Sequence, residues 1–172
     1  METVRFRHAH FSAHFPVDCR YAPSHYWMRP ADDAAAQGAA GLWRVGLTKF
    51  GTRMLGELVE MVLEVEPGAV VAGGSRLGTV EGFKAVSDLF CVVEGTFEAA
   101  NPAVGAEGCL THSDPYGAGW LYAVRGTPAP GALDVHGYIA VLAATIDKLQ
   151  ASRYGGDSAA PADDAGDPHA PA

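Results

Sequence analysis

The chain has 172 residues, of which 48% are hydrophobic and 19% are charged, and its formal net charge is −8. This length and composition are ordinary for one soluble globular domain with a hydrophobic core. The acidic balance argues against nucleic acid as a partner, because binding a phosphate backbone requires clustered Lys and Arg. Apolar runs remain well short of the roughly 20 residues that span a bilayer, so a membrane partner is not expected either.

The cysteines indicate the compartment. Cys19, Cys91 and Cys109 are odd in number and contain no CxxC pair, which favours reduced thiols in a cytoplasm over a disulfide framework. Residues 1–16 lack the apolar core of a secretory signal, although their arginines also fit a transit peptide weakly. The predicted location is therefore cytoplasmic.

The first 20 residues are rich in histidine. His8, His10, His14 and Cys19 are types of residue that ligate metals, but their spacing matches no zinc signature. The favoured interpretation is a polar N-terminal extension over residues 1–20, with a strand along 4–10 and no metal site.

From residue 21 onward, short strand patterns alternate with turn signals. An edge strand or ordered turn is expected at 21–29. Strands are expected at 42–47, 57–65, 70–72, 76–81, 87–93, 96–99 and 120–124, with Gly95 opening a turn. A short helix should follow an N-cap at Thr48 and end at Gly56. Loops are expected at 30–41 and, as a loop or one helical turn, at 101–108.

The C-terminal part carries a helical pattern. Apolar residues recur at helical spacing across 133–154, which predicts an amphipathic helix. The Ala, Pro and Asp composition of 155–172 predicts a disordered tail. The pattern as a whole predicts a mainly β fold, a sandwich or small barrel with short helices and a C-terminal amphipathic helix.

Lys84, one of three lysines, lies between the strands expected at 76–81 and 87–93. A hairpin turn would hold its amine in solvent on a rigid stem, which suits covalent attachment of a prosthetic group as a swinging arm. The alternative is an ordinary solvated turn lysine. The sequence contains no phosphate-cradling glycine loop, HExxH or GxSxG motif, so no catalytic residues and no enzyme activity are expected.

Several segments together carry a family resemblance. They are Tyr-Ala-Pro-Ser-His at 21–25 with Trp27, Val-Gly-Leu-Thr at 45–48, Leu-Gly-Glu-Leu-Val at 55–59, Val-Glu at 80–81, Lys-Ala-Val-Ser-Asp-Leu at 84–89, and Asp-Pro-Tyr-Gly-Ala-Gly-Trp-Leu at 114–121 after Asn101. On these motifs, residues 21–149 resemble the H protein of the glycine cleavage system, a lipoyl carrier.

The resemblance implies a lipoyl-type (barrel-sandwich) β-sandwich as the carrier domain, residues 21–154. It implies lipoate attached covalently to Lys84, with Glu81 and Asp88 as neighbouring cofactor-binding positions. It also implies a cleft in which the loaded arm parks, formed by Ser24, Tyr26 and Asp88. Such a carrier shuttles an aminomethyl group between glycine decarboxylase (P protein), aminomethyltransferase (T protein) and dihydrolipoyl dehydrogenase (L protein), after a lipoyl-attaching enzyme has modified it.

The sequence also departs from the family pattern. Tyr26 stands where the family usually has Glu, and His112 stands where it has Asn. Biotin carriers place Met on both sides of the lysine, whereas Phe83 and Ala85 favour lipoate. Two alternatives therefore accompany the glycine cleavage hypothesis: an H-like lipoyl carrier for another partner set, such as a lipoate relay or sulfur-oxidising complex, and an unmodified β-sandwich binding module.

Overall fold

The computed structural model describes residues 1–155; the predicted disordered tail, apart from its first residue, lies outside the described residues. The strands are β1 (Thr3–His8), β2 (Phe11–Pro16), β3 (Arg20–Tyr21), β4 (Tyr26–Pro30), β5 (Gly41–Leu47), β6 (Leu58–Leu63), β7 (Val70–Val71), β8 (Arg76–Gly82), β9 (Val86–Phe90), β10 (Val93–Ala100) and β11 (Tyr122–Pro128). The helices are α1 (Asp33–Ala36), α2 (Lys49–Leu55), α3 (Pro102–Ala106), α4 (Leu110–Ser113) and α5 (Val135–Gly155).

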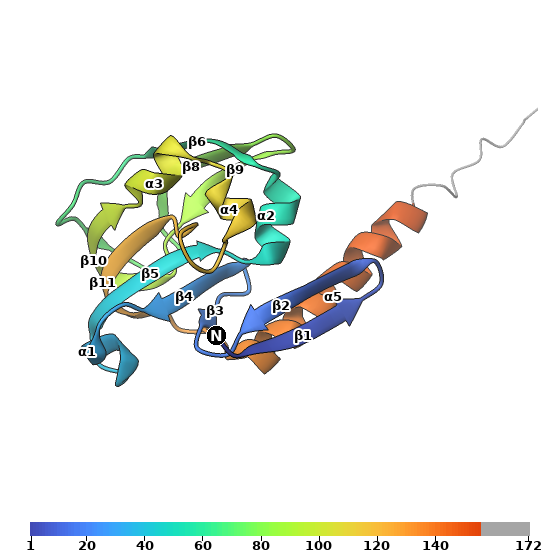
Figure 1. Cartoon of the computed structure of the whole chain (residues 1–172), viewed down its shortest axis with the longest axis horizontal. Helices are drawn as coiled ribbons and strands as arrows, with labels where there is room; N and C mark the ends of the chain where they lie inside the picture. Colours follow the sequence, from blue (N-terminus) through green and yellow to red (C-terminus); the bar gives the residue numbers. More distant parts are fainter. Residues whose placement is uncertain (156–172) are drawn as a thin grey trace, which may run out of the picture.

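Two antiparallel sheets form the main body. One has six strands in the order β3-β4-β5-β11-β10-β7, and the other has three in the order β6-β8-β9. Figure 1 shows the smaller sheet above the larger one. Side chains from both sheets, such as Val45 and Val124 from one and Val80 and Leu89 from the other, share one buried core. This arrangement confirms the predicted mainly β sandwich.

The short helix α2 forms where the sequence predicts it. The Thr48 hydroxyl accepts a hydrogen bond from the Gly51 N–H at 3.2 Å, which satisfies a free donor of the first turn. Gly56 ends the helix with a φ of +81°, a conformation that favours glycine. The chain then turns directly into β6, so α2 and β6 meet at a sharp corner.

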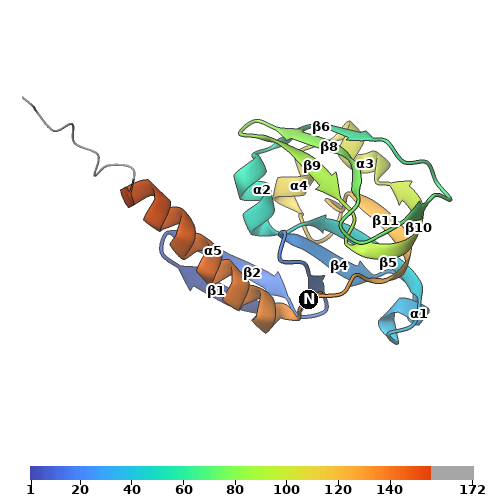
Figure 2. The ribbon, with the colours of Figure 1, turned by 180° about the vertical axis from the view of Figure 1, so that it is seen from behind.

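A second core joins the two ends of the described chain. The β1–β2 hairpin lies along α5 (Figure 2). The buried face of α5 consists of Val135, Tyr138, Leu142 and Ile146, at the spacing of one helix face. The Tyr138 ring stacks on Tyr21 with centroids 4.8 Å apart and meets Phe15 edge-on at 5.4 Å. The predicted amphipathic helix is therefore confirmed.

The structure corrects two expectations within residues 1–41, the extent of the first strand and the loop at 30–41. The strand expected along 4–10 is confirmed as β1 over residues 4–8, but it ends at His8 because Ala9 adopts a φ of +52° and the chain reverses there into β2. The loop expected at 30–41 contains α1, which forms because the Asp32 carboxylate accepts the Ala35 N–H at 2.9 Å.

Three further boundaries differ from the prediction. Gly95 lies inside β10, where it pairs with Gly126 of β11, instead of opening a turn. The position requires glycine because a Cβ there would collide with the Arg125 carbonyl of β11. The strand expected at 87–93 is divided between β9 and β10, and the one expected at 120–124 is β11, which extends to Pro128. Helix α4 was not expected from the sequence.

Truncating the buried face of α5 tests the second core. Leu142 is fully buried, so Leu142→Ala should lower the free energy of unfolding by about 2–5 kcal/mol, through lost burial and the cavity that remains. The matched control is Leu149→Ala on the same helix, where a side chain 40% exposed should cost about 1 kcal/mol or less. Urea titration of both variants provides the comparison, and equal losses would contradict this packing of α5.

Candidate functional site

Lys84 lies in the turn between β8 and β9. Glu81 and Val86 are the last paired residues of the hairpin, and the Gly82 N–H donates to the Ala85 carbonyl at 2.9 Å. The turn is open to solvent, and its Phe83 side chain is 77% exposed. Lys84 is thus presented at the tip of a closed hairpin, as the sequence predicts.

Backbone hydrogen bonds fix this turn to the α2–β6 corner. The Phe83 N–H donates to the Glu57 carbonyl, and the Lys84 N–H donates to the Leu55 carbonyl, each at 3.0 Å. Gly56 lies between these two acceptors, and a Cβ there would lie 2.9 Å from the Lys84 nitrogen. The close approach therefore requires glycine at position 56, and it gives the lysine a rigid base.

The lysine side chain continues along the same helix end. Its Nζ donates to the Arg53 carbonyl at 3.1 Å, one of the last-turn carbonyls that have no partner within a helix. A cation is favoured there because the carboxyl end of a helix carries partial negative charge. Lys84 therefore contacts the end of α2 through both its backbone and its amine.

A cleft of about 340 Å³ borders the turn. Its lining comes from the loop before β4, from the start of β4, from the end of β5, from α2 and from the β8–β9 hairpin. The lining residues are Ser24, His25, Tyr26, Leu47, Gly51, Met54, Leu55, Val80, Ala85, Val86 and Ser87. Ser24 and Tyr26, two of the three predicted parking residues, are brought together here beside the lysine turn.

The two predicted carboxylates, Asp88 and Glu81, lie outside the lining of this cleft. Asp88 is not among the lining residues of the cleft, and its carboxylate accepts from the Arg76 guanidinium at 2.8 Å on the exposed face of the hairpin. Glu81 is exposed on β8, opposite Val86. Among the lining residues described, the cleft contains no carboxylate.

Tyr26 occupies the position where a family carboxylate is expected. Its phenol is buried, and its oxygen accepts the Phe90 N–H at 3.3 Å. Burial raises the pKa of Tyr26, with a smaller contribution from the negative charge of Asp88, so the phenol stays neutral. The cleft wall therefore offers a neutral hydroxyl.

His25 connects the cleft to the second core. Its Nδ1 lies 2.9 Å from the Tyr138 hydroxyl, and its ring lies 4.6 Å from that of Phe50. Burial lowers the pKa of His25 to about 4, so the imidazole is neutral at physiological pH. The Tyr138 hydroxyl also lies 2.8 Å from Thr48 Oγ1, which extends the network to the cap of α2.

His112 lies close enough to Lys49 and Lys84 to be affected by their charges. Burial lowers its pKa, and the positive charges of Lys49 and Lys84 lower it further, although Glu57 opposes them. The Lys49 Nζ donates to the His112 carbonyl at 3.0 Å. The buried Nδ1 of His112 has no hydrogen-bond partner within residues 1–155. His112 is therefore a neutral side chain at the edge of this site.

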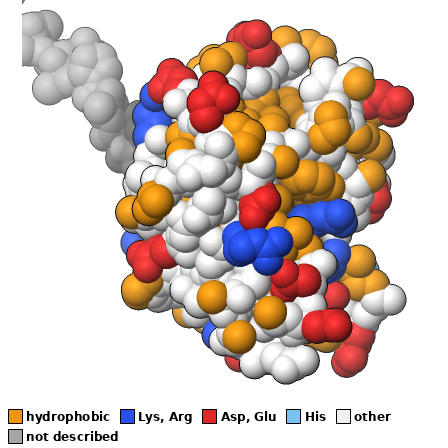
Figure 3. All heavy atoms as spheres, turned by 90° about the vertical axis from the view of Figure 1, so that its left-hand side faces the viewer, with side chains coloured by type: hydrophobic (Ala, Val, Ile, Leu, Met, Phe, Trp, Pro, Cys, Tyr) orange, Lys and Arg blue, Asp and Glu red, His pale blue; other side chains and the backbone are white. Residues whose placement is uncertain are grey.

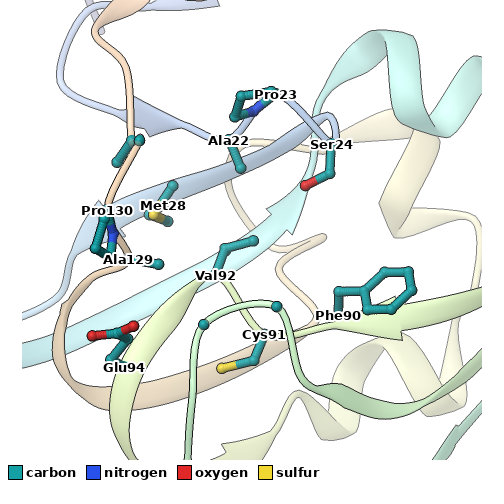
Figure 4. A pocket seen from close by; sticks show the side chains of 14 residues that line it. Ala22, Pro23, Ser24, Met28, Phe90, Cys91, Val92, Glu94, Ala129 and Pro130 are labelled. Atoms are coloured by element: carbon teal, nitrogen blue, oxygen red, sulfur yellow. The ribbon is translucent and has the colours of Figure 1, made fainter.

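Another hollow lies away from the lysine turn. It has a volume of about 390 Å³, and Figure 4 shows Ala22, Met28 and Val92 around it, with Glu94 at its edge. Glu94 is the one charged side chain among its lining residues, and no residue of the turn 82–85 lines it. This hollow shares Ser24 with the cleft, but it does not reach the lysine turn.

The histidines of the first 20 residues serve other contacts. His8 Nε2 lies 2.6 Å from the Asp147 carboxylate of α5, and His14 Nδ1 lies 3.4 Å from Thr3 Oγ1. Within residues 1–155, no three His, Cys, Asp or Glu side chains lie close enough together to hold a metal ion. No helix in that part of the chain has the length and apolar character needed to cross a membrane.

Two surface arginines, Arg76 and Arg125, are each paired with two acids. Figure 3 shows one face on which Lys and Arg side chains lie beside Asp and Glu side chains. Arg125 pairs with Glu98 at 2.8 Å and with Asp32 at 3.2 Å, and Arg76 pairs with both Glu64 and Asp88. Positive charge is therefore compensated locally at these places.

Comparison with known proteins identifies one family. The model of the family described as "Glycine cleavage H-protein" matches residues 19–134. Proteins named glycine cleavage system H protein include one from Mycobacterium leprae, 41% identical over 110 residues (64% of this chain, 77% of the relative). Another, from Pseudoalteromonas atlantica, is 33% identical over 129 residues (73% of this chain, 94% of the relative).

A solved structure agrees with these relatives. The crystal structure of a glycine cleavage system H protein from Mycobacterium marinum is 36% identical, with a TM-score of 0.64, and the match covers 73% of this chain and 97% of that one. The β1–β2 hairpin precedes the family match and α5 follows it. The second core is therefore completed by segments on either side of the matched region.

The low pKa of His25 predicts a stability change with pH. Between the ordinary pKa of 6.5 and the folded value of about 4, the unfolded chain binds a proton that the folded chain resists. The free energy of unfolding should therefore fall as the pH drops through this window, by on the order of 2 kcal/mol from this group. Urea titrations at pH 7 and pH 4.5 should show a smaller loss for His25→Gln than for the parent protein.

Carboxylates titrate in the same range, so the comparison needs a control. His136→Gln changes an exposed histidine at the start of α5, and its pH dependence should follow that of the parent. If His25→Gln also followed the parent, the buried neutral state of His25 would be excluded.

Proposed function

We propose, on the premise that this chain belongs to the glycine cleavage H-protein family, that it is the lipoyl carrier of a glycine cleavage system, with lipoate attached to Lys84. The observation that carries the proposal is the exposed lysine on a hairpin tip that backbone bonds fix to the α2–β6 corner. The chain would act as a carrier without a catalytic role. Its three unpaired cysteines support a reducing, cytoplasmic location.

The residues around Lys84 fit such a group. The lysine is exposed, and both neighbours, Phe83 and Ala85, are also exposed, so a modifying enzyme could reach the amine without unfolding the hairpin. Amide formation converts the ammonium to a neutral N–H, which can still donate to the Arg53 carbonyl but loses its charge attraction to the end of α2. The modified side chain would therefore be held less firmly than the free lysine.

In the shuttle, the protein itself would hold the lipoyl arm at a fixed point and present it to its partners. Lipoate supplies a reducible disulfide at the end of a long flexible chain. The bonds from Phe83 and Lys84 to the α2–β6 corner fix the origin of that chain, so its free end samples a limited volume and reaches a docked partner at high effective concentration. The proposed partners are glycine decarboxylase, aminomethyltransferase, dihydrolipoyl dehydrogenase and a lipoyl-attaching enzyme.

The cleft beside the turn is the proposed resting place of the loaded arm. A cationic aminomethyl group would meet the hydroxyls of Ser24 and Tyr26 there, but no carboxylate among the described lining residues. Asp88, on the neighbouring strand, is already paired with Arg76. The cleft should therefore hold the loaded arm less tightly than one with a free carboxylate would.

The comparisons favour glycine cleavage over the two alternatives. The chain covers 94% of the Pseudoalteromonas relative and 97% of the Mycobacterium marinum structure, and both bear the glycine cleavage name. A different partner set and an unmodified binding module lack comparable support. We further propose residues 21–154 as the carrier domain, with residues 1–20 as an addition to it.

Replacing the lysine tests the attachment. Protein made in its own host should show one lipoyl addition by intact mass, and Lys84→Arg should lack it because a guanidinium is not acylated by the attaching enzyme. Reconstitution with glycine decarboxylase, aminomethyltransferase and dihydrolipoyl dehydrogenase should give glycine turnover with the parent and a loss of at least about a thousandfold with Lys84→Arg.

Lys148→Arg is the matched control, since Lys148 is exposed on α5 and does not belong to the hairpin turn. It should keep both the mass addition and the turnover. An unmodified Lys84 in cells that make lipoate would exclude both carrier hypotheses. A lipoylated protein that supports no glycine turnover would leave only the carrier with another partner set.

Restoring an acid tests the cleft. Tyr26→Glu should slow release of the aminomethyl group from the loaded arm by roughly threefold to tenfold, because a nearby carboxylate attracts the cation by about 1 kcal/mol. The measurement is the decay of carrier loaded from labelled glycine, after circular dichroism has shown that the variant is folded. Tyr26→Phe, which adds no charge, is the control, and an unchanged decay in Tyr26→Glu would count against the cleft.

A further inference from the structure

A second hollow borders Lys84. It has a volume of about 380 Å³ and lies between the β1–β2 turn, α2 and α5. Its lining residues are Ala9, His10, Phe11, Phe50, Arg53, Met54, Lys84, Ile146, Leu149, Gln150 and Arg153, and we refer to it as the hairpin groove. Met54 lines both this groove and the cleft described above, so the two hollows meet at α2.

The lysine belongs to the wall of the hairpin groove. Lys84 is one of its lining residues, and its Nζ lies against the Arg53 carbonyl, also in the wall. The cleft, in contrast, is lined by the residues that follow the lysine, Ala85 to Ser87. A chain that grows from Nζ therefore begins in the hairpin groove.

The chemistry of the groove favours a neutral apolar occupant. Phe11, Phe50 and Ile146 form a buried apolar floor, while Met54 and Leu149 remain 49% and 40% exposed. Covering these two side chains with an aliphatic chain would remove apolar surface from water.

The charges of the groove disfavour a cation. Arg53, Arg153 and Lys84 contribute positive charge, and its described lining contains no carboxylate. The Arg53 guanidinium lies over the Phe11 ring, 5.5 Å from its centroid, so this charge is held in the wall. A positively charged group entering the groove would meet like charges.

We propose that the hairpin groove seats the lipoyl arm when it is unloaded, and that the aminomethyl-loaded arm, which is cationic, is excluded from it. This inference rests on the proposed attachment of lipoate to Lys84. The tether makes seating an intramolecular event, so even a weak apolar contact is populated. Attachment removes the positive charge of Lys84 from the wall, so in the modified protein Arg53 and Arg153 supply the like charge that disfavours the loaded arm.

Much of the groove wall lies outside the residues that the family model matches. Ala9, His10 and Phe11 precede the family match, and Ile146, Leu149, Gln150 and Arg153 follow it. Only the α2 residues and Lys84 belong to the matched region. The hairpin and α5 would thus give this carrier a seat for the empty arm in addition to the cleft.

A thiol placed in the groove tests the seat. In lipoylated protein carrying Cys109→Ser, which removes the exposed thiol, Leu149→Cys introduces a thiol into the wall. Its thiolate attacks one sulfur of the oxidised arm, so that the ring disulfide breaks, a mixed disulfide forms, and the other sulfur leaves as a thiolate that iodoacetamide alkylates. The readout is the linked peptide pair, measured against time by mass spectrometry.

Ala151→Cys in the same background is the matched control. Position 151 is exposed on α5, is not part of the groove wall, and lies at a similar distance along the helix. Leu149→Cys should form the linked pair at least about tenfold faster than Ala151→Cys, because seating raises the local concentration of the arm. Equal rates would overturn the proposed seat.

A second measurement does not depend on the introduced thiol. Reduction of the seated dithiolane by a water-soluble phosphine should be several-fold slower in the parent than in Leu149→Ser, which removes apolar wall at a half-exposed position. Equal reduction rates would also count against the seat. Intact mass establishes lipoylation before either test, so an unmodified lysine would overturn the proposed function, whereas a modified one with equal rates would overturn only the seat.

Discussion

The contact on which the site depends is the pair of backbone hydrogen bonds between the lysine turn and the α2–β6 corner. An isolated two-residue or four-residue hairpin tip is mobile, because few contacts restrain it. Here the N–H groups of Phe83 and Lys84 reach the Glu57 and Leu55 carbonyls across Gly56. The helix end gains partners for its free carbonyls, and the hairpin gains a fixed origin. Other features of the site, the cleft and the hairpin groove, are defined by where this corner places α2.

The family motif at residues 114–121 contacts the start of α2 and so supports the α2–β6 corner. The Tyr116 hydroxyl accepts the Lys49 N–H at 2.9 Å, which gives the first turn of α2 a partner. The Trp27 indole donates to the Pro115 carbonyl at 2.9 Å, and Asp114 accepts the Ala118 N–H at 2.8 Å within its own loop. The motif therefore acts structurally, since it joins β4 to the start of the helix whose other end holds the lysine.

Local patterns predicted those parts of the fold whose causes are local. Thr48 and Gly56 bound α2 because cap chemistry is read from single residues, and α5 follows from its apolar spacing. The position of Lys84 in a hairpin was equally readable. The hydrogen bonds from the turn to the Leu55 and Glu57 carbonyls could not be predicted from the sequence. They join segments far apart in the chain and use backbone groups that every residue carries. Gly56 is the one local signal of this contact, and by itself a glycine at that position indicates only the end of a helix.

The family pattern did not predict the charges of the cleft or the packing of the N-terminal hairpin. Ser24 and Tyr26 could be named from the motif, but the pairing of Asp88 with Arg76 depends on the register of β8 with β9. The histidines of the first 20 residues are compatible with metal chemistry or a plain extension, whereas the apolar Phe6, Phe11 and Phe15 of the same segment form the hydrophobic face that packs on α5. Within β2, the alternation of Phe11, Ala13 and Phe15 is a period-two signal, and the histidines beside it obscure it.

The second core has a consequence for how the chain folds. Its two halves, the β1–β2 hairpin and α5, enclose almost the whole described chain between them, so closing it requires a very long loop. During synthesis from the N-terminus, the sandwich core can close once β11 has emerged, while Phe15, Tyr21 and Trp27 still await Tyr138 and Leu142. The hairpin groove takes part of its wall from α5, so it cannot be complete before α5 has emerged and packed on the hairpin.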